Sequence, residues 1–332
     1  TVLTPYDSIR YSKYILQSGL LSTDPTTGHV KAWVGGIDYK YFQYDHVKQG
    51  KRQVGSTFKP FVYATAINQL GLSPCDEFPN TPYTIPAGKY YLDEDWTPRN
   101  SGDEYGGLRS LKNALANSIN VISANLIDQT TPQNVVRMAK NLGVESDIPA
   151  VPSVALGTVD LSLYEMVGAL NTFANKGMYV KPMMILRIED KNGTILEEFT
   201  PETKEVLSES IAYTTINLME GVTRYGSGVR LRTSGGKYPD NVATGYPYQF
   251  DNAIAGKTGT TQNQSDGWFI GLVPNLSTGI WVGAEERSVH FVDITRGQGA
   301  SMALPIWALY MKRNYADEDL EISKEDFEKP EN

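Results

Sequence analysis

The sequence predicts an α+β fold, an α/β sandwich in which one antiparallel sheet is flanked by helices and carries an inserted helical lobe. Two observations lead to this prediction. Runs of alternating apolar residues, typical of strands, occur near both ends of the chain, at residues 30–34 and 253–284. Runs with a helical apolar period fill the middle. An active site is expected at the seam between the sheet and the lobe.

The first strands are expected directly after a polar segment. Residues 1–19 are polar with scattered Tyr and Ile and are interpreted as the end of a linker. A turn of Asp, Pro, Thr and Gly at residues 24–28 leads into the alternating run at 30–34, which predicts a hairpin. The folded domain is expected to cover residues 20–313. Residues 314–332 are dominated by Asp, Glu and Lys and are expected to be a fraying tail.

A helix is expected to begin at or just after Ser56. Its apolar residues follow a helical period, Pro60 falls in the first turn, and Gly71 suits the position after the last turn. Residues 80–107 are rich in Pro, Gly, Tyr and Asp, which predicts a long irregular loop of the kind that is often functional. The remaining predictions are helices at 108–127, 132–142, 161–176, 208–221 and 300–313, a hairpin at Asn192-Gly193, and strands at 253–260, 267–273 and 279–284.

Composition limits the function classes. The 332 residues include 40% hydrophobic and 20% charged side chains, so the chain can bury a core. The net charge of −8 argues against a nucleic-acid partner, which would require clustered Lys and Arg. The single cysteine, Cys75, excludes an intramolecular disulfide. The three histidines lack metal-ligand spacing, so neither a metal nor a cofactor is expected.

Targeting segments are not visible in the sequence. No apolar run approaches the roughly 20 residues that a membrane-spanning helix requires. The chain begins at Thr1 without a methionine or a signal peptide. We therefore expect a longer natural protein from which anchoring or export signals have been removed, and a soluble fragment here.

Three short motifs occur in one order along the chain: Ser56-Thr57-Phe58-Lys59, Ser118-Ile119-Asn120 and Lys257-Thr258-Gly259-Thr260. Together they describe a serine acyl-transfer site that needs no histidine. Ser56 supplies the hydroxyl nucleophile, and Lys59 lies on the same helix face one turn later. Lys59 can accept the serine proton only if its pKa is lowered, which burial or a second cation, Lys257, can achieve.

Each motif has a simpler interpretation when it is taken alone. The first could be a helix N-cap with a solvated lysine, and the third an exposed edge strand blunted by Lys and Gly. The second could be polar decoration of a helix, although Ser and Asn disfavour helix interiors. The order and wide separation of the three motifs favour a common site over coincidence.

The residues around the motifs resemble one family. The segments that carry the resemblance are 53–61, Trp96-Thr97-Pro98-Arg99-Asn100, 111–120, 152–158, 255–261 and 266–271. They are similar to the transpeptidase domain of class A, high-molecular-mass penicillin-binding proteins, from about Leu20 to Arg313. The resemblance implies a penicillin-binding protein or serine β-lactamase-like fold. It also implies a full-length protein with an upstream glycosyltransferase domain and a membrane anchor, acting on the extracytoplasmic face of a bacterial membrane.

The resemblance further implies a mechanism for cross-linking peptidoglycan. Ser56 attacks the penultimate D-Ala carbonyl of a stem peptide, and Lys59 accepts its proton. Ser118 passes a proton to the leaving D-Ala, and Asn120 holds the substrate amide and Lys59. An amine from a second stem peptide then resolves the acyl-enzyme. β-Lactam antibiotics would acylate the same serine and inhibit the protein.

The same resemblance assigns the groups that bind the donor peptide. Backbone N–H groups of Ser56 and Thr260 would form the oxyanion hole. The terminal carboxylate would be held by Lys257, Thr258 and Thr260. Gly259 would let the backbone come close.

Two other functions share these motifs. A serine β-lactamase or D,D-carboxypeptidase would hydrolyse its acyl-enzyme and needs a base, for which Glu165 is the candidate. A non-catalytic β-lactam sensor would keep Ser56 and Lys59 and be acylated without turnover. The long loop carries Trp96 and Asn100, which are expected to bind substrate. This loop favours a cleft for an extended polymer over a receptor for a small drug.

Overall fold

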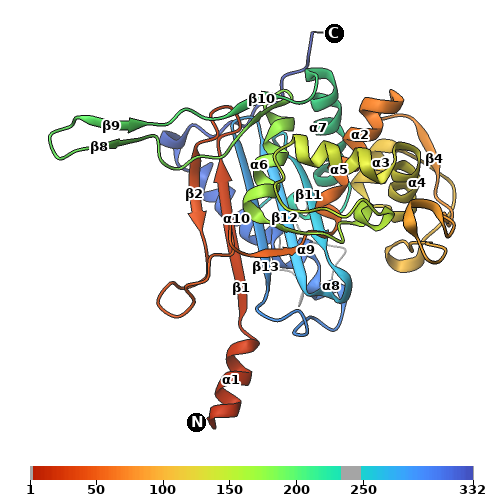
Figure 1. Cartoon of the computed structure of the whole chain (residues 1–332), viewed down its shortest axis with the longest axis horizontal. Coiled ribbons are helices and arrows are strands. Elements are labelled where there is room, and N and C mark those ends of the chain that lie inside the picture. The colour runs from red at the N-terminus through yellow and green to blue at the C-terminus, as the bar shows by residue number, and fades with distance from the viewer. Residues whose placement is uncertain (1–2, 233–247, 332) are drawn as a thin grey trace.

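A computed structural model describes residues 3–232 and 248–331 of the chain. Its centre is a five-stranded antiparallel sheet in the order β11-β12-β13-β1-β2 (Figure 1). The strands are β1 (Leu16–Thr23), β2 (Val30–Val34), β11 (Ala255–Thr260), β12 (Asp266–Val273) and β13 (Leu276–Ala284). The predicted hairpin of the first strands and the meander of the last strands are both confirmed.

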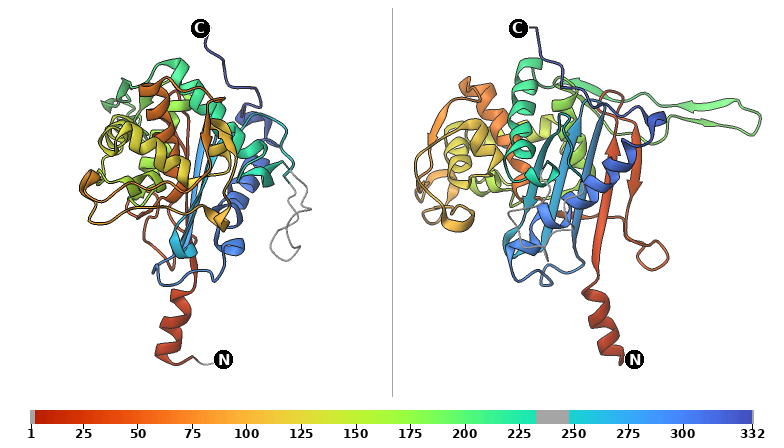
Figure 2. Two further views of the ribbon diagram at one scale, coloured as in Figure 1. Left: turned by 90° about the vertical axis from the view of Figure 1, so that its right-hand side faces the viewer. Right: turned by 180° about the vertical axis from the view of Figure 1, so that it is seen from behind.

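Helices cover both faces of the sheet, as predicted. α6 (Leu163–Ala174) and α7 (Glu209–Arg224) pack on one face, and α9 (Gly299–Met302) and α10 (Leu304–Asn314) pack on the other, as Figure 2 shows from behind. Adjacent side chains of a strand point to opposite faces. Leu20 therefore joins the core that contains α10, whereas Leu21 joins the core that contains α6. With both faces covered, β12 and β13 are buried from end to end.

The helical lobe lies beside the β11 edge of the sheet (Figure 1). It contains α2 (Lys59–Leu70), α3 (Leu111–Ala116), α4 (Asn120–Thr130) and α5 (Pro132–Asn141). α2 is central, because every residue from Lys59 to Ile67 is buried and α4, α5 and α7 pack against it. Gly71 follows α2 in the left-handed conformation (φ 66°), as predicted.

The helix predicted over residues 108–127 is interrupted at the second motif. Leu108–Ser110 form the short strand β5, α3 follows, and α4 begins only after Ile119. Ser118 lies in the break at φ +57°, and the N–H of Ile119 donates to the carbonyl of Ala114. This is a Schellman ending with Ser118 where glycine is usual. The prediction of one helix was wrong because the apolar spacing of the sequence continues across the break.

The N-terminal boundary of the domain also differs from the prediction. β1 begins at Leu16, so residues 16–19 belong to the central sheet and not to a linker. Helix α1 (Pro5–Lys13) precedes it and is capped by the hydroxyl of Thr4. Thr1 and Val2, at the start of the predicted linker, lie outside the described residues. The helix was missed because no α1 residue is buried and the segment is short and mostly polar.

The C-terminal segment packs on the body instead of fraying. The side chain of Phe327 is buried in the larger core, and the Asn275 side chain binds the backbone of Glu321 and Ser323. The charged composition of the segment gave no sign of these contacts. Burying one aromatic side chain stabilises the packed segment, whereas the many charged side chains around it stay in water and contribute little either way. Asn332 lies outside the described residues.

The other predicted elements are present. The hairpin at Asn192-Gly193 projects from the body (Figure 1), and the helices predicted at 132–142, 161–176, 208–221 and 300–313 correspond to α5, α6, α7 and α9–α10. Within the described ranges, no helix has the length and apolarity to cross a membrane. The short strands are β3 (Lys51–Gln53), β4 (Glu77–Pro79), β6 (Asp160–Ser162), β7 (Met178–Val180), β8 (Arg187–Glu189), β9 (Ile195–Glu198) and β10 (Thr203–Glu205), and α8 is Ile294–Gly297.

Candidate active site

The first motif forms the entry to α2. Gly55–Phe58 make a 3₁₀ turn that runs directly into α2. Ser56 is half-buried in this turn, and Pro60 sits in the first turn of α2, where its missing N–H does no harm. The prediction of a helix beginning at or just after Ser56 is thus confirmed. Backbone N–H groups of a helix start are free to bind a developing negative charge.

Glycines allow the Ser56 turn to sit against β11. A side chain at Gly259 would place its Cβ 2.7 Å from the carbonyl oxygen of Val54. Gly55 has φ +53°, and its Cβ would lie 2.7 Å from the carbonyl oxygen of Thr260. Any larger residue would push the nucleophile away from the third motif. Gly259 brings two backbones together within the protein, β11 and the residue before the turn that carries Ser56.

Lys59 joins the first motif to the second. Its side chain is fully buried, and Nζ lies 2.6 Å from the carbonyl oxygen of Ser118, 3.1 Å from the Ser118 Oγ and 2.7 Å from Asn120 Oδ1. Burial lowers the pKa of Lys59 well below its usual value, and the nearby charge of Lys257 lowers it further. The position of Ser118 in the left-handed region is what turns its carbonyl and hydroxyl together towards Lys59.

Lys257 joins the third motif to the same serine. It is fully buried in β11, and its Nζ lies 3.1 Å from Ser118 Oγ and 3.1 Å from the carbonyl oxygen of Thr258. Burial lowers the pKa of Lys257 to about 7. The Ser118 hydroxyl therefore bridges the two lysines.

The hydrogen bonds around Ser118 are compatible with a neutral Lys59. A neutral amine has two N–H donors and one lone pair. Lys59 can give its two protons to the two carbonyl-type oxygens and accept the third bond from the Ser118 hydroxyl. Lys257 can then donate to the Ser118 oxygen as an ammonium. This arrangement, with Lys59 neutral and Lys257 charged, gives an acceptor to both N–H groups of Lys59 and to two of the three N–H groups of Lys257.

A distant loop holds the second motif in place. Asn100 Oδ1 accepts the N–H groups of Asn120 (3.0 Å) and Val121 (3.2 Å), which are the first residues of α4. The Asn120 side chain in turn donates to the carbonyl of Arg99 (2.7 Å), which turns its Oδ1 towards Lys59. Ile119 precedes α4 without a side-chain cap, so Asn100 supplies the missing cap from another part of the chain.

Asn100 was expected to bind substrate, and its contacts are with the protein. Its Nδ2 donates to Asn80 Oδ1 and to the carbonyl of Glu104, and the residue is only 8% exposed. Both ends of the amide are therefore occupied by the scaffold of the loop and α4. Sequence reasoning missed this role because a cap supplied across the fold leaves no local signal.

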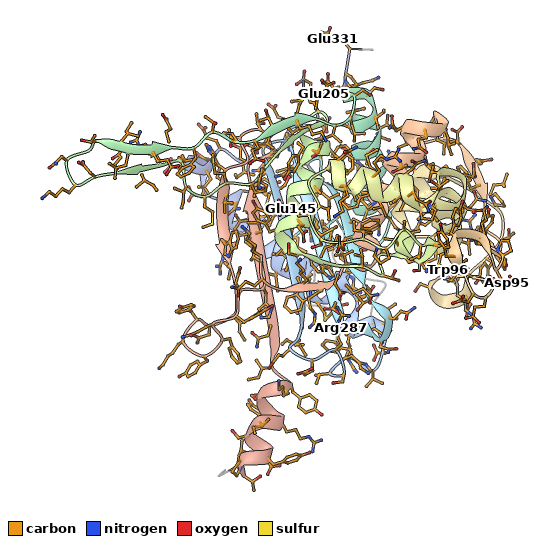
Figure 3. All side chains as sticks on the ribbon, in the orientation of Figure 1. Asp95, Trp96, Glu145, Glu205, Arg287 and Glu331 are labelled. Atoms are coloured by element: carbon orange, nitrogen blue, oxygen red, sulfur yellow. The ribbon has the colours of Figure 1, made fainter. Side chains whose placement is uncertain are left out.

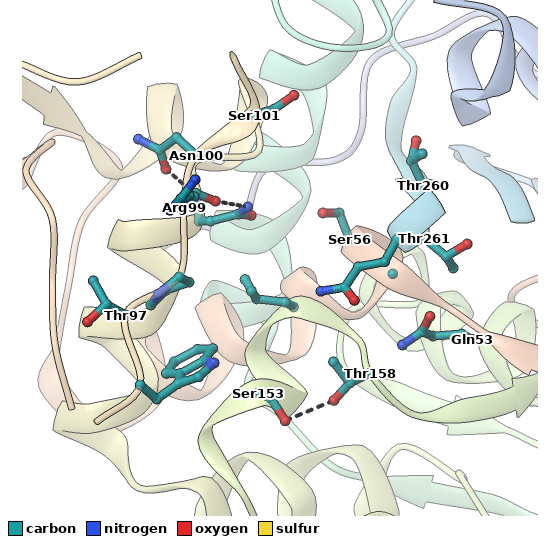
Figure 4. A pocket seen from close by; sticks show the side chains of 16 residues that line it. Gln53, Ser56, Thr97, Arg99, Asn100, Ser101, Ser153, Thr158, Thr260 and Thr261 are labelled. Atoms are coloured by element: carbon teal, nitrogen blue, oxygen red, sulfur yellow. Dashed lines mark hydrogen bonds between the residues drawn. The ribbon is translucent and has the colours of Figure 1, made fainter. Parts of the chain in front are cut away.

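A cavity of about 510 Å³ opens at Ser56 (Figure 4). We call it the Ser56 cavity; Ser56 and Thr260 lie on one side, and Arg99 and Asn100 face them from the other. Trp96, at the outer edge of the helical lobe in Figure 3, also lines it. Across the described residues, the Ser56 hydroxyl has no hydrogen-bond partner, which leaves it available to a substrate.

The two threonines of the third motif have different partners. The hydroxyl of Thr260 accepts the N–H of Gly299 (3.1 Å), and its own proton remains free to donate. The hydroxyl of Thr258 lies 2.6 Å from that of Ser227. Ser227 was not singled out in the sequence, because a lone serine after α7 carries no motif. It adds a second hydroxyl beside Lys257 and the Ser118 turn.

Glu165, the candidate hydrolytic base, is committed elsewhere. Its carboxylate accepts hydrogen bonds from the backbone and hydroxyl of Ser162, in a capping box at the start of α6, and from the backbone and hydroxyl of Ser146. It does not line the Ser56 cavity. A base that activates water must reach the acyl group, and Glu165 does not.

Known proteins are similar to this chain in both sequence and fold. The profile of the family described as penicillin binding protein transpeptidase domain matches residues 19–285. Penicillin-binding protein 1A of Aquifex aeolicus is 35% identical over 315 residues, which are 93% of this chain and 40% of that protein. Penicillin-binding protein 1A of Neisseria meningitidis is 32% identical over 305 residues, 90% of this chain and 36% of that protein. The chain thus spans well under half the length of these relatives.

Solved structures of other proteins have the same fold as this chain. Penicillin-Binding Protein 1A from Haemophilus influenzae superposes with a TM-score of 0.81 at 24% identity, over 95% of this chain and 49% of that one. PonA1 from Mycobacterium tuberculosis in complex with penicillin V superposes with a TM-score of 0.76 at 24% identity, over 98% of this chain and 85% of that one. These likenesses confirm the predicted fold class. The profile match over residues 19–285 and the 35% identity to the Aquifex aeolicus protein over 93% of this chain show that the chain belongs to the penicillin-binding protein transpeptidase domain family.

Proposed function

We propose that this chain is a serine D,D-transpeptidase that cross-links peptidoglycan stem peptides through an acyl-enzyme on Ser56. One observation carries the proposal. Lys59, Ser118, Asn120 and Lys257 form one buried hydrogen-bond network, at the turn that presents the Ser56 hydroxyl to a cavity. The network contains a neutral base and a proton carrier and needs neither a metal nor a histidine.

Acylation begins when the Ser56 oxygen attacks the penultimate D-Ala carbonyl. Lys59 takes the serine proton, and the negative charge that develops on the carbonyl oxygen is held by backbone N–H groups of Ser56 and Thr260. Ser118 then gives its proton to the nitrogen of the leaving D-Ala and is reprotonated from Lys59. The ester forms as the peptide bond breaks, and Lys59 returns to its neutral state.

Substrate is held by groups on both sides of the serine. We assign the terminal carboxylate of the donor to Lys257, Thr258 and Thr260, because Lys257 is the cation that stays charged. Trp96 offers an aromatic wall for the stem peptide at the far side of the cavity. Asn100 acts as a positioning residue, through Asn120, and does not bind substrate directly.

β-Lactams would enter by the same chemistry and remain attached. Opening of the lactam ring forms the same ester on Ser56, but the leaving nitrogen stays tethered to the acyl group. Glu165 is held by Ser146 and Ser162 and cannot activate water at the ester. The adduct is therefore long-lived, which supports an inhibited transpeptidase over a β-lactamase or a D,D-carboxypeptidase.

The setting of the activity follows from its substrate. Peptidoglycan lies outside the cytoplasmic membrane, so we place this domain on the extracytoplasmic face. The relatives are longer than this chain, and we propose that it works as one part of a membrane-anchored protein with an upstream glycosyltransferase domain.

Mass spectrometry after exposure to penicillin tests the proposal. One adduct per chain is expected, and peptide mapping should place it on Ser56. Ser56→Ala should remove the adduct. Ser153→Ala is the matched control, since this serine lines the same cavity and its hydroxyl accepts a hydrogen bond from Thr158. An adduct on another residue, or labelling that survives Ser56→Ala, would overturn the assignment.

A further inference from the structure

A cavity with polar and aromatic walls opens beside the N-terminal end of β1. Its volume is about 420 Å³. The loop between β2 and β3 supplies Phe42, Tyr44 and His46 to its lining, and β1 supplies Gln17. We call it the Tyr44 cavity. It shares no lining residue with the Ser56 cavity, so none of the acylation steps uses it.

The wall of the Tyr44 cavity holds polar atoms that the protein does not satisfy. Gln17 is only 4% exposed, and its Oε1 has no hydrogen-bond partner among the described residues. Arg52 also lines the cavity. Its Nε and Nη1 bond to Asp266 and to the carbonyl of Glu285, but its buried Nη2 is unpaired within the same residues. Buried polar atoms are nearly always paired, so these two indicate a missing partner.

The side-chain amide of Gln17 suits a ligand that both donates and accepts. In the part of the chain that the structure describes, neither its oxygen nor its nitrogen forms a hydrogen bond. The last torsion of a glutamine is broad and roughly two-fold, so the amide can turn either end to the cavity without backbone movement. A second amide, with a neighbouring N–H and C=O, would pair with both ends.

The aromatic wall of the cavity is held in a fixed orientation. His46 stacks on the buried Trp281, with ring centroids 4.8 Å apart, and Tyr44 meets His46 at 5.1 Å with an interplanar angle of 65°. Burial and the nearby charge of Arg52 lower the pKa of His46, so its ring is neutral at pH 7. Tyr44 is nevertheless 54% exposed. An oriented, exposed ring offers a flat apolar surface to the C–H face of a sugar.

Most of the charge around the Tyr44 cavity is already paired. Arg52 forms an ion pair with Asp266, and Glu285 forms one with Lys13. Of the charged side chains that line the cavity, this leaves Lys51 outside the ion pairs of the described residues. A phosphate or a polycarboxylate would require a cluster of free cations. A neutral ligand fits this lining better.

We propose that the Tyr44 cavity binds an N-acetylated sugar of the glycan strand that carries the stem peptide. The acetamido group pairs with the Gln17 amide, and the sugar ring lies on Tyr44. This inference rests on the proposed function, because it takes the ligand from the peptidoglycan on which Ser56 acts.

The position of β3 connects the two cavities. Arg52 lines the Tyr44 cavity, and the next residue, Gln53, lines the Ser56 cavity (Figure 4). Neighbouring strands lie about 5 Å apart, and an extended peptide gains about 3.5 Å per residue. A stem peptide of a few residues is therefore long enough to pass a strand. The sugar would hold the glycan on one side of β3 while the end of its stem peptide reacts on the other.

Ligand-observed NMR tests the sugar site directly. The probe is a trimer of N-acetylglucosamine, for which saturation transfer and a Kd on the order of 1 mM are expected, as for other small polar ligands. Gln17→Leu removes the amide at similar volume and should weaken binding about tenfold. Tyr44→Ala removes the aromatic surface and should weaken it about fivefold.

Three controls accompany the binding measurement. Tyr41→Ala removes an exposed tyrosine of the same loop that does not line the cavity, and should leave the Kd unchanged. A maltose trimer has sugar rings without acetamido groups and should bind at least about fivefold more weakly. Penicillin acylation of every variant should stay within about twofold of wild type, which shows that each is folded.

A donor comparison tests whether the site serves cross-linking. One donor is a D-Ala-D-Ala stem peptide attached to an N-acetylated disaccharide, and the other is the same peptide without sugar. Wild type should have the higher kcat/KM for the donor with the sugar. Gln17→Leu and Tyr44→Ala should remove that preference and leave kcat/KM for the sugar-free donor unchanged.

The outcomes separate this site from the proposed function. No saturation transfer at about 10 mM trimer, or an equal Kd in all variants, would overturn the sugar site and leave water as the partner of Gln17. Displacement of the trimer by the sugar-free stem peptide would overturn it in favour of a peptide site. Sugar binding without a donor preference would overturn the link to the glycan strand. Absence of an adduct on Ser56 would instead overturn the proposed function and leave the NMR result standing.

Discussion

Two fully buried ionisable side chains lie on neighbouring strands, and they differ in whether an opposite charge lies beside them. Asp266, in β12, is neutralised: Arg52 Nε lies 2.6 Å from its carboxylate, and the Trp281 indole N–H and the Ser265 hydroxyl also donate to it. Lys257, in β11, has no such counterion. Its ammonium contacts only a hydroxyl and a carbonyl oxygen.

Lys59 is likewise buried without a counterion. Among the described residues neither Lys59 nor Lys257 forms an ion pair, and both have a lowered pKa because burial penalises their charged form. A buried charge with a counterion and hydrogen-bond donors is compensated within the fold. A buried cation surrounded only by dipoles loses its proton more easily, and Lys59 is favoured as the base of the two because the charge of Lys257 also lowers its pKa. The difference separates a structural charge from a functional one within a single sheet.

The largest effect is expected from changing the base. Lys59→Arg keeps a cation but removes the ability to become neutral, so the rate of penicillin acylation should fall about 10³-fold. Lys257→Arg keeps the charge that its role requires and should lose only about tenfold. Stopped-flow acylation of the two variants measures both. Equal losses would break the division of roles between the lysines.

Changing Asp266, the structural charge, should lower the free energy of unfolding and leave the acylation rate of the folded protein unchanged. Asp266→Asn leaves the partly exposed Arg52 guanidinium without its carboxylate and removes a buried acceptor, which should cost about 3 kcal/mol in the free energy of unfolding, measured in urea. Asp160→Asn is the control, because its ion pair with Arg287 is exposed and should cost at most about 1 kcal/mol. A loss of acylation per folded molecule in Asp266→Asn would contradict the comparison.

Changing Asn100, which caps α4 from another part of the chain, should have a smaller effect on both stability and acylation. Asn100→Ala removes the acceptor for two N–H groups of α4 and should cost about 1–2 kcal/mol of stability. It should also slow acylation, because Asn120 would no longer be held towards Lys59. Asn100→Asp keeps the acceptor for α4 but loses the donor to Asn80 and Glu104, so it should lose stability while keeping most of its acylation rate per folded molecule. If substrate binding were the main role of Asn100, both variants would raise the donor KM and leave stability unchanged.

No effect on adduct lifetime is expected from Glu165. Its hydrogen bonds place it with the structural charges, so Glu165→Gln should destabilise the start of α6 and leave slow penicillin release unchanged over hours. The measurement is release of label after a single acylation. Rapid turnover of penicillin that depends on Glu165 would establish the β-lactamase alternative.

The sequence predicted which motif residues lie together better than it predicted the contacts that support them. The three motifs identified Ser56, Lys59 and Lys257, because acyl transfer requires those residue types and each motif has a fixed internal spacing. Asn100 was assigned to substrate, since its contacts with α4 depend on how a long loop folds. The break at Ser118 was missed because periodicity records which residues are apolar and does not register one residue at positive φ.

The position of β1 in the sheet determines how the domain would resist a pulling force. It lies between β13 and β2 and pairs with β13 over its full length, and α1 continues from its N-terminal end (Figure 1). Tension applied through α1 would act along the strand, so the hydrogen bonds to both neighbours would be loaded in parallel and would have to break together. A strand pulled sideways would unzip one bond at a time. A pull on α1 would therefore meet more resistance than a pull across the sheet.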